Sequence, residues 1–285
     1  DSYKLNEIVK ISGKVTAYSG YSIDNATVKY RVIRSASYPY RRWWDYIMPR
    51  ANQQEIAQGQ VVTDKDGNYN FEFNALSDDR DNKTQTVYNY KITIDATDIN
   101  GETHTATSTI SIGNISMYIK LDIPEEICID KTDNQFSLTT TNLSGNPQAA
   151  ALQYKIVALE TPSSYLHKRG TPNPTVQLLD ENLLRKTFPY LELKDENSKD
   201  KWKVLEVKSS GTLRTPADSL LTIPNLRLYD EGYYKIIITS KDSYNQEVTL
   251  EQIIFLYKEN SNYCKAYEPI WLNVDKVSAE PGEKI

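Results

Sequence analysis

Histidine and the sequence motifs of hydrolytic enzymes are scarce in this chain of 285 residues. His104 and His167 are its only histidines, and they lie on separate parts of the chain. Neither a metal site nor a catalytic base is therefore expected from them. No Gly-x-Ser-x-Gly motif supports a serine nucleophile. The sequence predicts a protein that is not an enzyme and that needs no cofactor.

Long apolar runs, a basic surplus and an excess of glycine or proline are also missing. No apolar run approaches the roughly 20 residues that a membrane-spanning helix needs. The formal net charge is -5 and the sequence pI is about 5.3, whereas nucleic-acid binding needs a basic face. Arg41 and Arg42 form only a local basic pair. With Gly 11 and Pro 12, the chain is not of low complexity.

Tyrosine is abundant, with 21 copies, and two tyrosine-rich landmarks occur twice. Residues 88–98, YNYKITIDATD, are echoed by residues 232–242, GYYKIIITSKD. Upstream, residues 28–32, VKYRV, are echoed by residues 152–156, LQYKI. Two landmarks in the same order indicate one β-module that is built twice. We therefore expect an all-β protein of tandem immunoglobulin/fibronectin-III-like β-sandwiches.

The first module is expected to cover residues 1–113, the size of an immunoglobulin-like sandwich. Alternating or β-rich segments predict its strands at residues 8–17, 28–33, 55–63, 69–73, 88–97 and 103–112. Residues 64–67 are expected to turn with a positive φ at Gly67. Asn100-Gly101 is a strong hairpin signal and predicts a hairpin between the last two strands.

The second module is expected to cover residues 114–265, with an insertion around residues 161–190. Its strands are predicted at residues 117–123, 127–129, 135–141, 152–159, 202–207, 220–223, 232–240 and 247–257. The insertion holds a short helix candidate, Leu178 to Lys186, which Pro189 ends. Residues 266–285 are typical of the first strand of a following domain. We expect the chain to be a fragment of a longer protein.

The two cysteines lack the close spacing of zinc ligands. Cys128 lies near the first strand of the second module, and Cys264 follows its last strand. The first and last strands of a sandwich can be neighbours, so a disulfide between them is one interpretation. Two separate, partly buried thiols are the other.

The sharpest local anomaly is an aromatic segment with an arginine pair in the first module. Its candidate surface residues are Tyr40, Arg42, Trp43, Trp44 and Tyr46. Aromatic residues together with arginine favour recognition, so a platform for a protein or a sugar is one interpretation. The other is a long loop that packs its rings on its own sandwich or on the next domain. Burying one tryptophan stabilises by roughly 5 kcal/mol, which favours packing.

The carboxylates of Asp64 and Asp66 invite a calcium interpretation, because hard cations bind clustered carboxylates. Only two acids are present in the segment, and the remaining ligands of a calcium loop are missing. The turn interpretation is therefore preferred, and no metal site is predicted. The mixed charges of residues 194–203 are expected to form a solvated loop.

Several of these segments together resemble the macroglobulin domains of bacterial alpha-2-macroglobulin-family proteins. The resemblance is carried by residues 13–20 (GKVTAYSG), 26–32 (ATVKYRV), 59–71 (GQVVTDKDGNYNF), 232–236 (GYYKI) with Asp242, and 280–283 (EPGE). It covers nearly the whole chain, and the order of the motifs carries it more than any single one. The aromatic segment is most similar to versions in Bacteroidetes-type bacteria.

The resemblance implies a large periplasmic, cell-envelope or extracellular protein that traps proteases. Its partners would be target proteases and neighbouring macroglobulin domains, with membrane contact only through an anchor outside this fragment. Some family members capture the protease through a Cys-Gln thioester. Cys128 is followed by Ile-Asp-Lys and Cys264 by Lys-Ala-Tyr, so neither matches the thioester motif. The thioester and the bait region are therefore expected outside these residues.

A β-sandwich array also hosts other functions, because fold alone does not determine function. One alternative is a cell-surface carbohydrate- or protein-binding module, such as an adhesin. Another is an accessory array of an extracellular enzyme. Exposed, coplanar rings at Trp43 and Trp44 would favour sugar binding, whereas rings buried against the second module would favour a scaffold.

Overall fold

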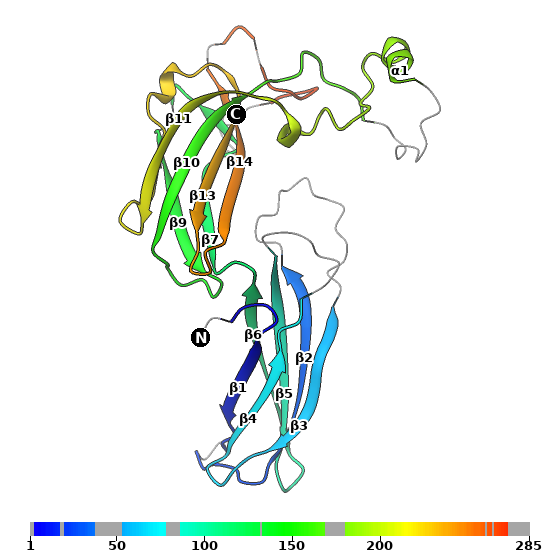
Figure 1. The fold of residues 1–285 in the computed structure, drawn as a ribbon, viewed down its shortest axis with the longest axis vertical. Coiled ribbons are helices and arrows are strands. Elements are labelled where there is room, and N and C mark those ends of the chain that lie inside the picture. The colour runs from blue at the N-terminus through cyan, green and yellow to red at the C-terminus, as the bar shows by residue number, and fades with distance from the viewer. Residues whose placement is uncertain are drawn as a thin grey trace, which may run out of the picture.

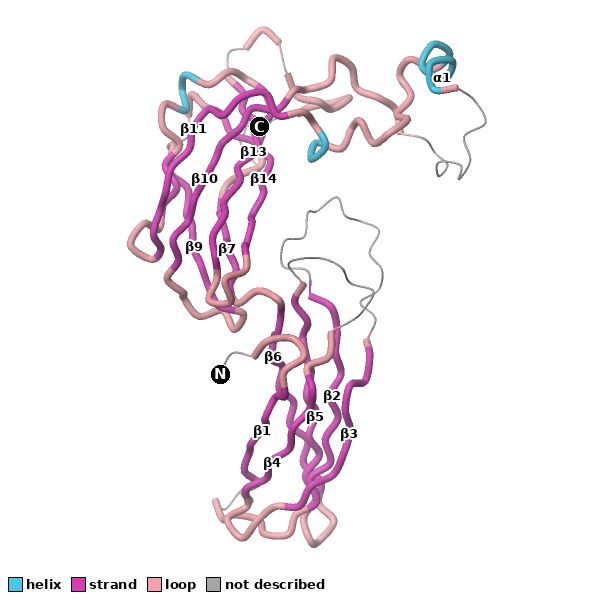
Figure 2. The backbone as a smooth tube through the Cα atoms, viewed as in Figure 1, coloured by secondary structure: helices cyan, strands magenta, loops and turns pink. Residues whose placement is uncertain are grey.

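In the computed structural model the chain forms two β-sandwiches arranged end to end (Figure 1). The structure describes residues 3–17, 20–37, 53–77, 86–131, 133–168, 180–259, 261–263 and 265–272. Strands dominate both sandwiches, and the helical segments of these ranges follow the tenth strand (Figure 2). None of these helical segments is long and apolar enough to cross a membrane. The all-β class predicted from the alternating segments is confirmed.

The first sandwich packs a four-stranded antiparallel sheet against a two-stranded sheet. The larger sheet has the strand order β3-β2-β5-β6, and β1 pairs with β4 in the smaller one. The strands are β1 (Ile8–Lys14), β2 (Thr27–Ser37), β3 (Gln54–Val62), β4 (Asn68–Asn74), β5 (Val87–Thr97) and β6 (Thr103–Gly113). Each strand overlaps a predicted segment, and most of them alternate because one face of the strand meets the core, whereas β6 is exposed over Thr103–Thr109.

Aromatic side chains from β4 and β5 fill the core of the first sandwich. Phe71 and Phe73 are buried on one face of β4 and Tyr69 is half-buried beside them, as the alternation predicted. The ring of Phe73 lies 5.8 Å from the ring of Tyr90, which is fully buried on β5. The Tyr90 hydroxyl donates to the Leu76 carbonyl at 2.9 Å, and burial raises the Tyr90 pKa.

The second sandwich repeats this architecture and adds strands at its edges. Its sheets have the orders β11-β10-β13-β14-β8 and β12-β9-β7. The strands are β7 (Met117–Asp122), β8 (Glu126–Cys128), β9 (Gln135–Asn142), β10 (Ala150–Leu159), β11 (Val204–Thr215), β12 (Leu220–Thr222), β13 (Gly232–Lys241) and β14 (Glu247–Tyr257). The run β11-β10-β13-β14 matches β3-β2-β5-β6, so both sequence landmarks occupy equivalent strands. This equivalence confirms the internal repeat.

A five-residue turn recurs between strands of both sandwiches. An Asp or Asn side chain at the first position accepts from the amides of the third and fifth positions. The fourth position has a positive φ and is glycine or asparagine, which tolerate that conformation. The copies span residues 64–68, 98–102, 142–146 and 242–246. Hydrogen bonds from the Asn68 and Glu102 amides lower the pKa of Asp64 and Asp98.

This turn forms the hairpin predicted between β5 and β6. The predicted hairpin through Asn100 and Gly101 is confirmed, and both residues lie within the five-residue turn. Asp98 and Glu102 close the loop, with the Asp98 amide donating to the Glu102 carbonyl at 2.9 Å. The Asp98 side chain supplies the hydrogen bonds that a tighter turn would take from the opposite strand.

An extension leaves the second sandwich between β10 and β11. It contains α1 (Glu181–Thr187) and a 3-10 turn, η1 (Lys199–Lys201), and a second 3-10 turn, η2 (Leu226–Leu228), precedes β13. The predicted helix is confirmed, although α1 begins at Glu181 because the Asp180 side chain caps the amides of Asn182 and Leu183. In Figure 1, α1 lies away from both sheets.

The described part of the C-terminal segment packs against the second sandwich. Residues 265–272 contain no assigned strand, and the Tyr267 ring is buried with Trp202 and Tyr233. Residues 273–285 lie outside the described residues. The strand of a following domain therefore stays a prediction.

Candidate functional site

The aromatic segment singled out by the sequence lies outside the described residues. Its candidate surface residues, Tyr40, Arg42, Trp43, Trp44 and Tyr46, are all in this part of the chain. Their role as a partner or interdomain surface stays a prediction.

The strand that precedes that segment locates its start. Ser37, the last residue of β2, pairs with Val87, and Val87 pairs with Gly113. Gly113 leads into the second sandwich. The aromatic segment thus starts from the end of the sheet at which the two sandwiches meet.

The cysteines and histidines do not form a described cluster. Cys128 is buried at the end of β8, whereas Cys264 lies outside the described residues, so their disulfide stays a prediction. His104 Nε2 on β6 lies 2.8 Å from Glu102 Oε1, and both side chains are exposed. His167 lies in the extension, in an isolated bridge with Leu191. Within the described ranges, no group of acidic, histidine or cysteine side chains is arranged to hold a metal ion.

The junction between the sandwiches is built around a carboxylate that the sequence landmarks contain. Asp242 occupies the first position of the turn between β13 and β14, and its Oδ1 accepts from the Tyr244 and Gln246 amides at 2.8 Å each. Its Oδ2 accepts from the Ser116 amide at 2.6 Å. Ser116 follows β6 in the linker, so one buried carboxylate closes the turn and fixes the linker.

Hydroxyl groups extend this contact beside Asp242. The Ser243 amide donates to Ser116 Oγ at 3.1 Å, and the two serine hydroxyls are 2.7 Å apart. Ser116 is buried, so these bonds satisfy linker groups that water does not reach. The hairpin turn of the second sandwich is therefore hydrogen-bonded to the linker at three points.

Apolar packing also crosses the junction. Val87, the first residue of β5, is fully buried in the same cluster as Ile115 and Met117. That cluster is the core of the second sandwich. Because Val87 belongs to the first sandwich, the two sandwiches share a small apolar contact in addition to the hydrogen bonds.

Residues that precede β1 complete the junction on the other side of the same turn. The Tyr244 hydroxyl donates to the Tyr3 carbonyl at 3.3 Å. The Lys4 ammonium lies 4.4 Å from the centre of the Tyr244 ring, a cation–π contact. Lys4 also forms a parallel bridge with Gly113. The turn at 242–246 thus touches both the entry and the exit of the first sandwich.

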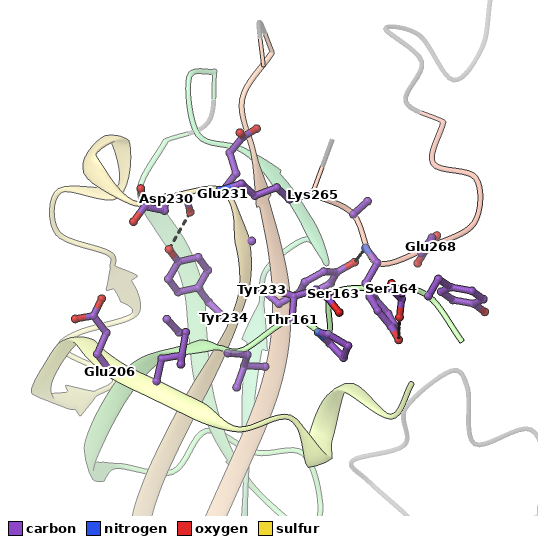
Figure 3. Close-up of a pocket in the computed structure, with 18 of the residues that line it drawn as sticks. Thr161, Ser163, Ser164, Glu206, Asp230, Glu231, Tyr233, Tyr234, Lys265 and Glu268 are labelled. Atoms are coloured by element: carbon purple, nitrogen blue, oxygen red, sulfur yellow. Dashed lines mark hydrogen bonds between the residues drawn. The ribbon is translucent and has the colours of Figure 1, made fainter. Parts of the chain in front are cut away.

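A hollow of about 510 Å³ lies at the opposite end of the second sandwich (Figure 3). It is lined by residues of β10, β11 and β13, of the start of the extension, of the loop before β13 and of the C-terminal segment, among them Tyr165, Glu206, Asp230, Tyr233 and Lys265. Both acidic and basic side chains line the hollow, so its surface does not carry charge of a single sign.

Several polar groups around this hollow already serve the fold. The Tyr234 hydroxyl donates to the Asp230 carbonyl at 2.8 Å, and burial raises the Tyr234 pKa to about 12. The Glu231 carboxylate accepts from the Lys258 amide and from the Ser261 hydroxyl. The arrangement thus stabilises the end of the sheet.

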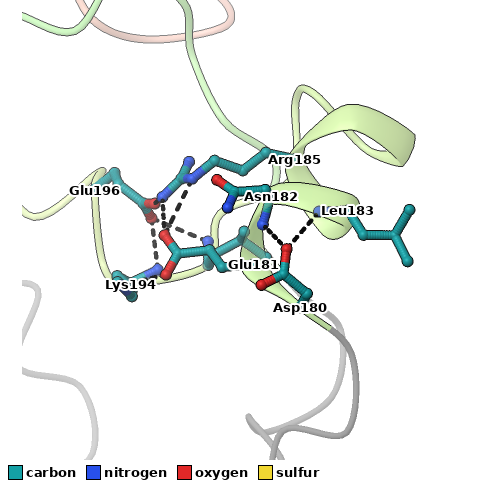
Figure 4. Close-up of polar contacts among 8 residues, drawn as sticks. Asp180, Glu181, Asn182, Leu183, Arg185, Lys194 and Glu196 are labelled. Atoms are coloured by element: carbon teal, nitrogen blue, oxygen red, sulfur yellow. Dashed lines mark hydrogen bonds and ion pairs between the residues drawn. The ribbon is translucent and has the colours of Figure 1, made fainter.

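Charged side chains organise the outer part of the extension (Figure 4). The Arg185 guanidinium lies 3.0 Å from a Glu181 oxygen and 2.6 Å from a Glu196 oxygen. The other Glu196 oxygen accepts from the Leu193 and Lys194 amides. Burial raises the pKa of Glu196. Hydrogen bonds from the Lys194 amide and the Arg185 guanidinium lower the pKa by more than burial raises it, so the pKa is about 2. Lys194 also forms an ion pair with Glu181.

An aromatic cluster attaches the base of the extension to the sheet. Trp202 is buried, with ring centroids 5.0 Å from Tyr233 and 4.9 Å from Tyr267 in edge-to-face geometry. The Trp202 indole donates to the Glu196 carbonyl at 2.8 Å, which links this base to the ionic cluster. The Tyr267 hydroxyl lies 2.8 Å from Asn197 Oδ1. The base of the extension is therefore packed on the sheet, and the loop predicted for residues 194–203 is solvated only in part, because Trp202 is buried while Lys194, Asp195 and Lys201 are exposed.

The junction residues were not selected as a site by the sequence analysis. Asp242 was noted only as part of a family-like strand, and Ser116 was not singled out. The available signal was the equivalence of Asp98 and Asp242 at the ends of the two repeated landmarks. That signal marks the turn, but it gives no indication of the linker amide that Asp242 also binds.

No family model and no curated protein matches this sequence. Solved structures with limited similarity include the trypsin-activated alpha-2-macroglobulin from Escherichia coli, at 12% identity and a TM-score of 0.38. The match covers 99% of this chain and 18% of that protein. The Salmonella alpha-2-macroglobulin reacted with methylamine matches at 11% identity and a TM-score of 0.39, covering 89% of this chain and 16% of that protein.

A tetra-tandem repeat of a large adhesion protein is also similar, at 11% identity and a TM-score of 0.24. That match covers 88% of this chain and 50% of the other. This chain therefore spans less than a fifth of the two macroglobulins named above. The all-β sandwich assignment rests on the sheets themselves.

Proposed function

We propose that this chain is a non-catalytic scaffold of two macroglobulin-type domains in a protease-trapping protein of the bacterial alpha-2-macroglobulin family. The family resemblance of the ordered sequence motifs supports the assignment. The observation that carries the scaffold role is the anchored junction, in which the Asp242 carboxylate binds the Ser116 linker amide at 2.6 Å. A scaffold needs its domains held at a defined spacing, and this contact fixes the linker.

The junction is also suited to passing a rearrangement from one domain to the next. Its hydrogen bonds and its apolar contact through Val87 involve few residues, and small interdomain interfaces permit relative motion. A shift of the β13–β14 turn would move Ser116 directly, because both are hydrogen-bonded. In this proposal, cleavage of a bait region outside the chain changes the spacing of the domains through such contacts.

The proposed partners are target proteases, reached through the full-length protein, and neighbouring macroglobulin domains of the same polypeptide. The proposed location is the periplasm, the cell envelope or the extracellular space of a Bacteroidetes-type bacterium. The bait region and any thioester would lie outside these residues. No binding of nucleic acid is proposed, in line with the net charge of -5.

The test is limited proteolysis of the full-length protein with several unrelated proteases, followed by small-angle X-ray scattering. We expect one clustered cut outside residues 1–285 and a more compact particle after it. Absence of any change in particle dimensions after complete cleavage would contradict the trap function. Protection of residues 38–52 by a glycan would instead support the carbohydrate-binding alternative.

The scaffold role is tested separately with a matched pair of variants in the full-length protein. Asp242→Ala removes the carboxylate that binds both its own turn and the linker, whereas Asp98→Ala removes the equivalent carboxylate of the first sandwich. We expect Asp242→Ala to alter the dimensions of the uncleaved particle and Asp98→Ala to leave them unchanged. Equal dimensions for all three proteins would contradict a scaffold role for the junction.

A further inference from the structure

The outer face of the larger sheet of the first sandwich carries a hollow of about 560 Å³, the sheet-face hollow. It spans β3, β2 and β5, which lie side by side (Figure 1). Core residues such as Val28, Val32 and Ile94 alternate along these strands with residues that face outward. The outward side chains that line the hollow are all polar: Lys29, Arg31, Gln58, Gln60, Thr93 and Asp95. The hollow is therefore a hydrogen-bonding surface on the side of the sheet away from the core.

The strand register arranges these side chains in two parallel rows. The rows are Gln60, Lys29 and Asp95, and Gln58, Arg31 and Thr93. Neighbouring strands are about 4.8 Å apart, and alternate residues of one strand are about 6.7 Å apart. Each row thus sets one cation between a carboxamide and a side chain that ends in oxygen.

The two cations of the hollow are not used by the fold. Both Lys29 and Arg31 are exposed, and neither side chain forms an ion pair or a hydrogen bond with any residue that the structure describes. Asp95 lies directly opposite Lys29, but its Oδ1 accepts a hydrogen bond from the Thr105 hydroxyl at 2.6 Å instead. The positive charges are therefore available to an anionic group that enters the hollow.

The equivalent face of the second sandwich does not repeat this set. The repeated landmarks align Lys29 with Gln153 and Arg31 with Lys155. The partners of Gln153 and Lys155 on β11 and β13 are shorter or apolar, namely Ser210, Thr212, Ile237 and Thr239. The two faces share the same backbone pairing, so the fold does not account for the polar set of the first sandwich.

The chemistry of the six side chains restricts the ligand. A guanidinium binds a carboxylate through two parallel hydrogen bonds, and an ammonium adds a point charge beside it. Carboxamides both donate and accept, whereas the Asp95 carboxylate only accepts. Asp95 therefore needs a donor such as a hydroxyl and repels a bare anion such as sulfate. The set fits a molecule that carries a carboxylate and several hydroxyl groups.

We propose that the sheet-face hollow binds an acidic oligosaccharide, one whose sugar rings carry carboxylates. Arg31 holds a carboxylate of the sugar, and Lys29 balances its charge. Gln58, Gln60 and Asp95 bind the hydroxyls on either side. This site is separate from the aromatic segment, and it would hold the first sandwich against an acidic polysaccharide. The inference goes beyond the scaffold role and does not depend on protease trapping.

The test is calorimetric titration of the whole chain with hexagalacturonic acid. We expect saturable binding that Arg31→Ala weakens by about tenfold or more, because a charge-assisted hydrogen-bond pair is lost. Lys155→Ala, at the equivalent position of the second sandwich, is the matched control and should leave the affinity unchanged. Both positions are exposed, and circular dichroism checks that each variant is folded. Absence of saturable binding, or an equal loss in the two variants, would overturn the proposal.

A third variant separates sugar recognition from simple attraction of anions. Asp95→Ala removes a negative charge, so it would strengthen the binding of any simple anion. We expect it instead to weaken the binding of hexagalacturonic acid by about threefold, because a hydroxyl loses its acceptor. Stronger binding in Asp95→Ala would contradict recognition of a sugar.

Other probes identify other ligands. Maltohexaose has hydroxyls without carboxylates, and hexaglutamate has carboxylates without hydroxyls, so each should bind about tenfold more weakly than hexagalacturonic acid. Equal affinity for hexaglutamate would overturn the proposal in favour of an acidic protein partner. Loss of binding in Trp43→Ala with none in Arg31→Ala would also overturn it, because the oligosaccharide would then bind the aromatic segment.

Discussion

The ring of Tyr30 on β2 lies directly over Gly59 on the neighbouring edge strand β3. A Cβ atom added to Gly59 would be 2.5 Å from the Tyr30 hydroxyl oxygen. The same relationship occurs in the second sandwich, where a Cβ on Gly211 would be 2.8 Å from the Tyr154 ring. Both pairs face each other across strands. Each sandwich therefore uses a glycine on its edge strand to seat a tyrosine of the repeated landmark.

Gly59→Ala is expected to destabilise the first sandwich by about 1–3 kcal/mol, because the Tyr30 ring has to move. That ring is stacked on Phe71 with centroids 3.9 Å apart, which limits its freedom. Urea unfolding followed by tyrosine fluorescence measures the change. Gln60→Ala, at an exposed position of the same strand, is the control and should remain within about 0.5 kcal/mol of the unsubstituted protein. Equal stability of the two variants would contradict this account of the pair.

Asp242→Ala is expected to loosen the junction, because it leaves the buried Ser116 amide without its acceptor. An unsatisfied buried amide costs about 1–3 kcal/mol. Hydrogen exchange should accelerate at Ser116 and at the Tyr244 and Gln246 amides. Asp98→Ala is the matched control, since its carboxylate serves only its own turn, and exchange there should increase without any effect at Ser116. An unchanged Ser116 amide in Asp242→Ala would show that the linker is held by other contacts.

Trp202→Ala is expected to detach the base of the extension from the sheet. Removing a buried tryptophan costs about 3–5 kcal/mol, and here it also removes the edge-to-face contacts with Tyr233 and Tyr267. Proteolysis within residues 180–201 should become faster while the strands of both sheets stay resistant. Trp202→Phe keeps an aromatic ring and should show a smaller effect. Unaltered proteolysis in the alanine variant would argue against the aromatic cluster as the anchor.

The outer part of the extension is expected to lose stability in acid through Glu196. Its folded pKa of about 2 lies below the ordinary value of 4.5, so its contribution is present above pH 4.5. Protonation removes that contribution as the pH falls from about 4.5 through about 2. Hydrogen exchange of the Leu193 and Lys194 amides, corrected for intrinsic rates, measures the loss. Glu196→Gln should abolish this dependence, and a steep dependence that persists in the variant would assign it to another group.

Most strands of both sandwiches were predictable because one of their faces is buried. β11 was predicted too short, at residues 202–207, whereas it spans Val204–Thr215. Its Ser209-Ser210-Gly211 stretch has the composition of a turn, and no local signal keeps it extended. Gly211 continues the strand because it lies under Tyr154, which is distant in sequence. The contact between Gly211 and Tyr154 joins two strands that are distant in sequence, so the residues around Gly211 alone do not reveal it.

The junction was only partly predictable for a related reason. The turn that begins at Asp242 follows from its match to Asp98, because both carboxylates bind amides of their own turns. The second role of Asp242 depends on where Ser116 lies after folding, 126 residues away in sequence. The ionic cluster was likewise not predicted, since Arg185 lies in the predicted helix and Glu196 in the predicted solvated loop, and charge composition does not reveal which charges converge.

The bond between Ser116 and Asp242 has a mechanical consequence. It connects the linker to the β13–β14 turn of the second sandwich, so it lies in parallel with the covalent step from Ser116 into β7. A tension that pulls the two sandwiches apart is shared between that hydrogen bond and the backbone. Ser116 cannot leave the second sandwich until the bond breaks, and the turn at 242–246 therefore contributes, together with the other junction contacts, to the force at which the two halves of the chain yield to each other.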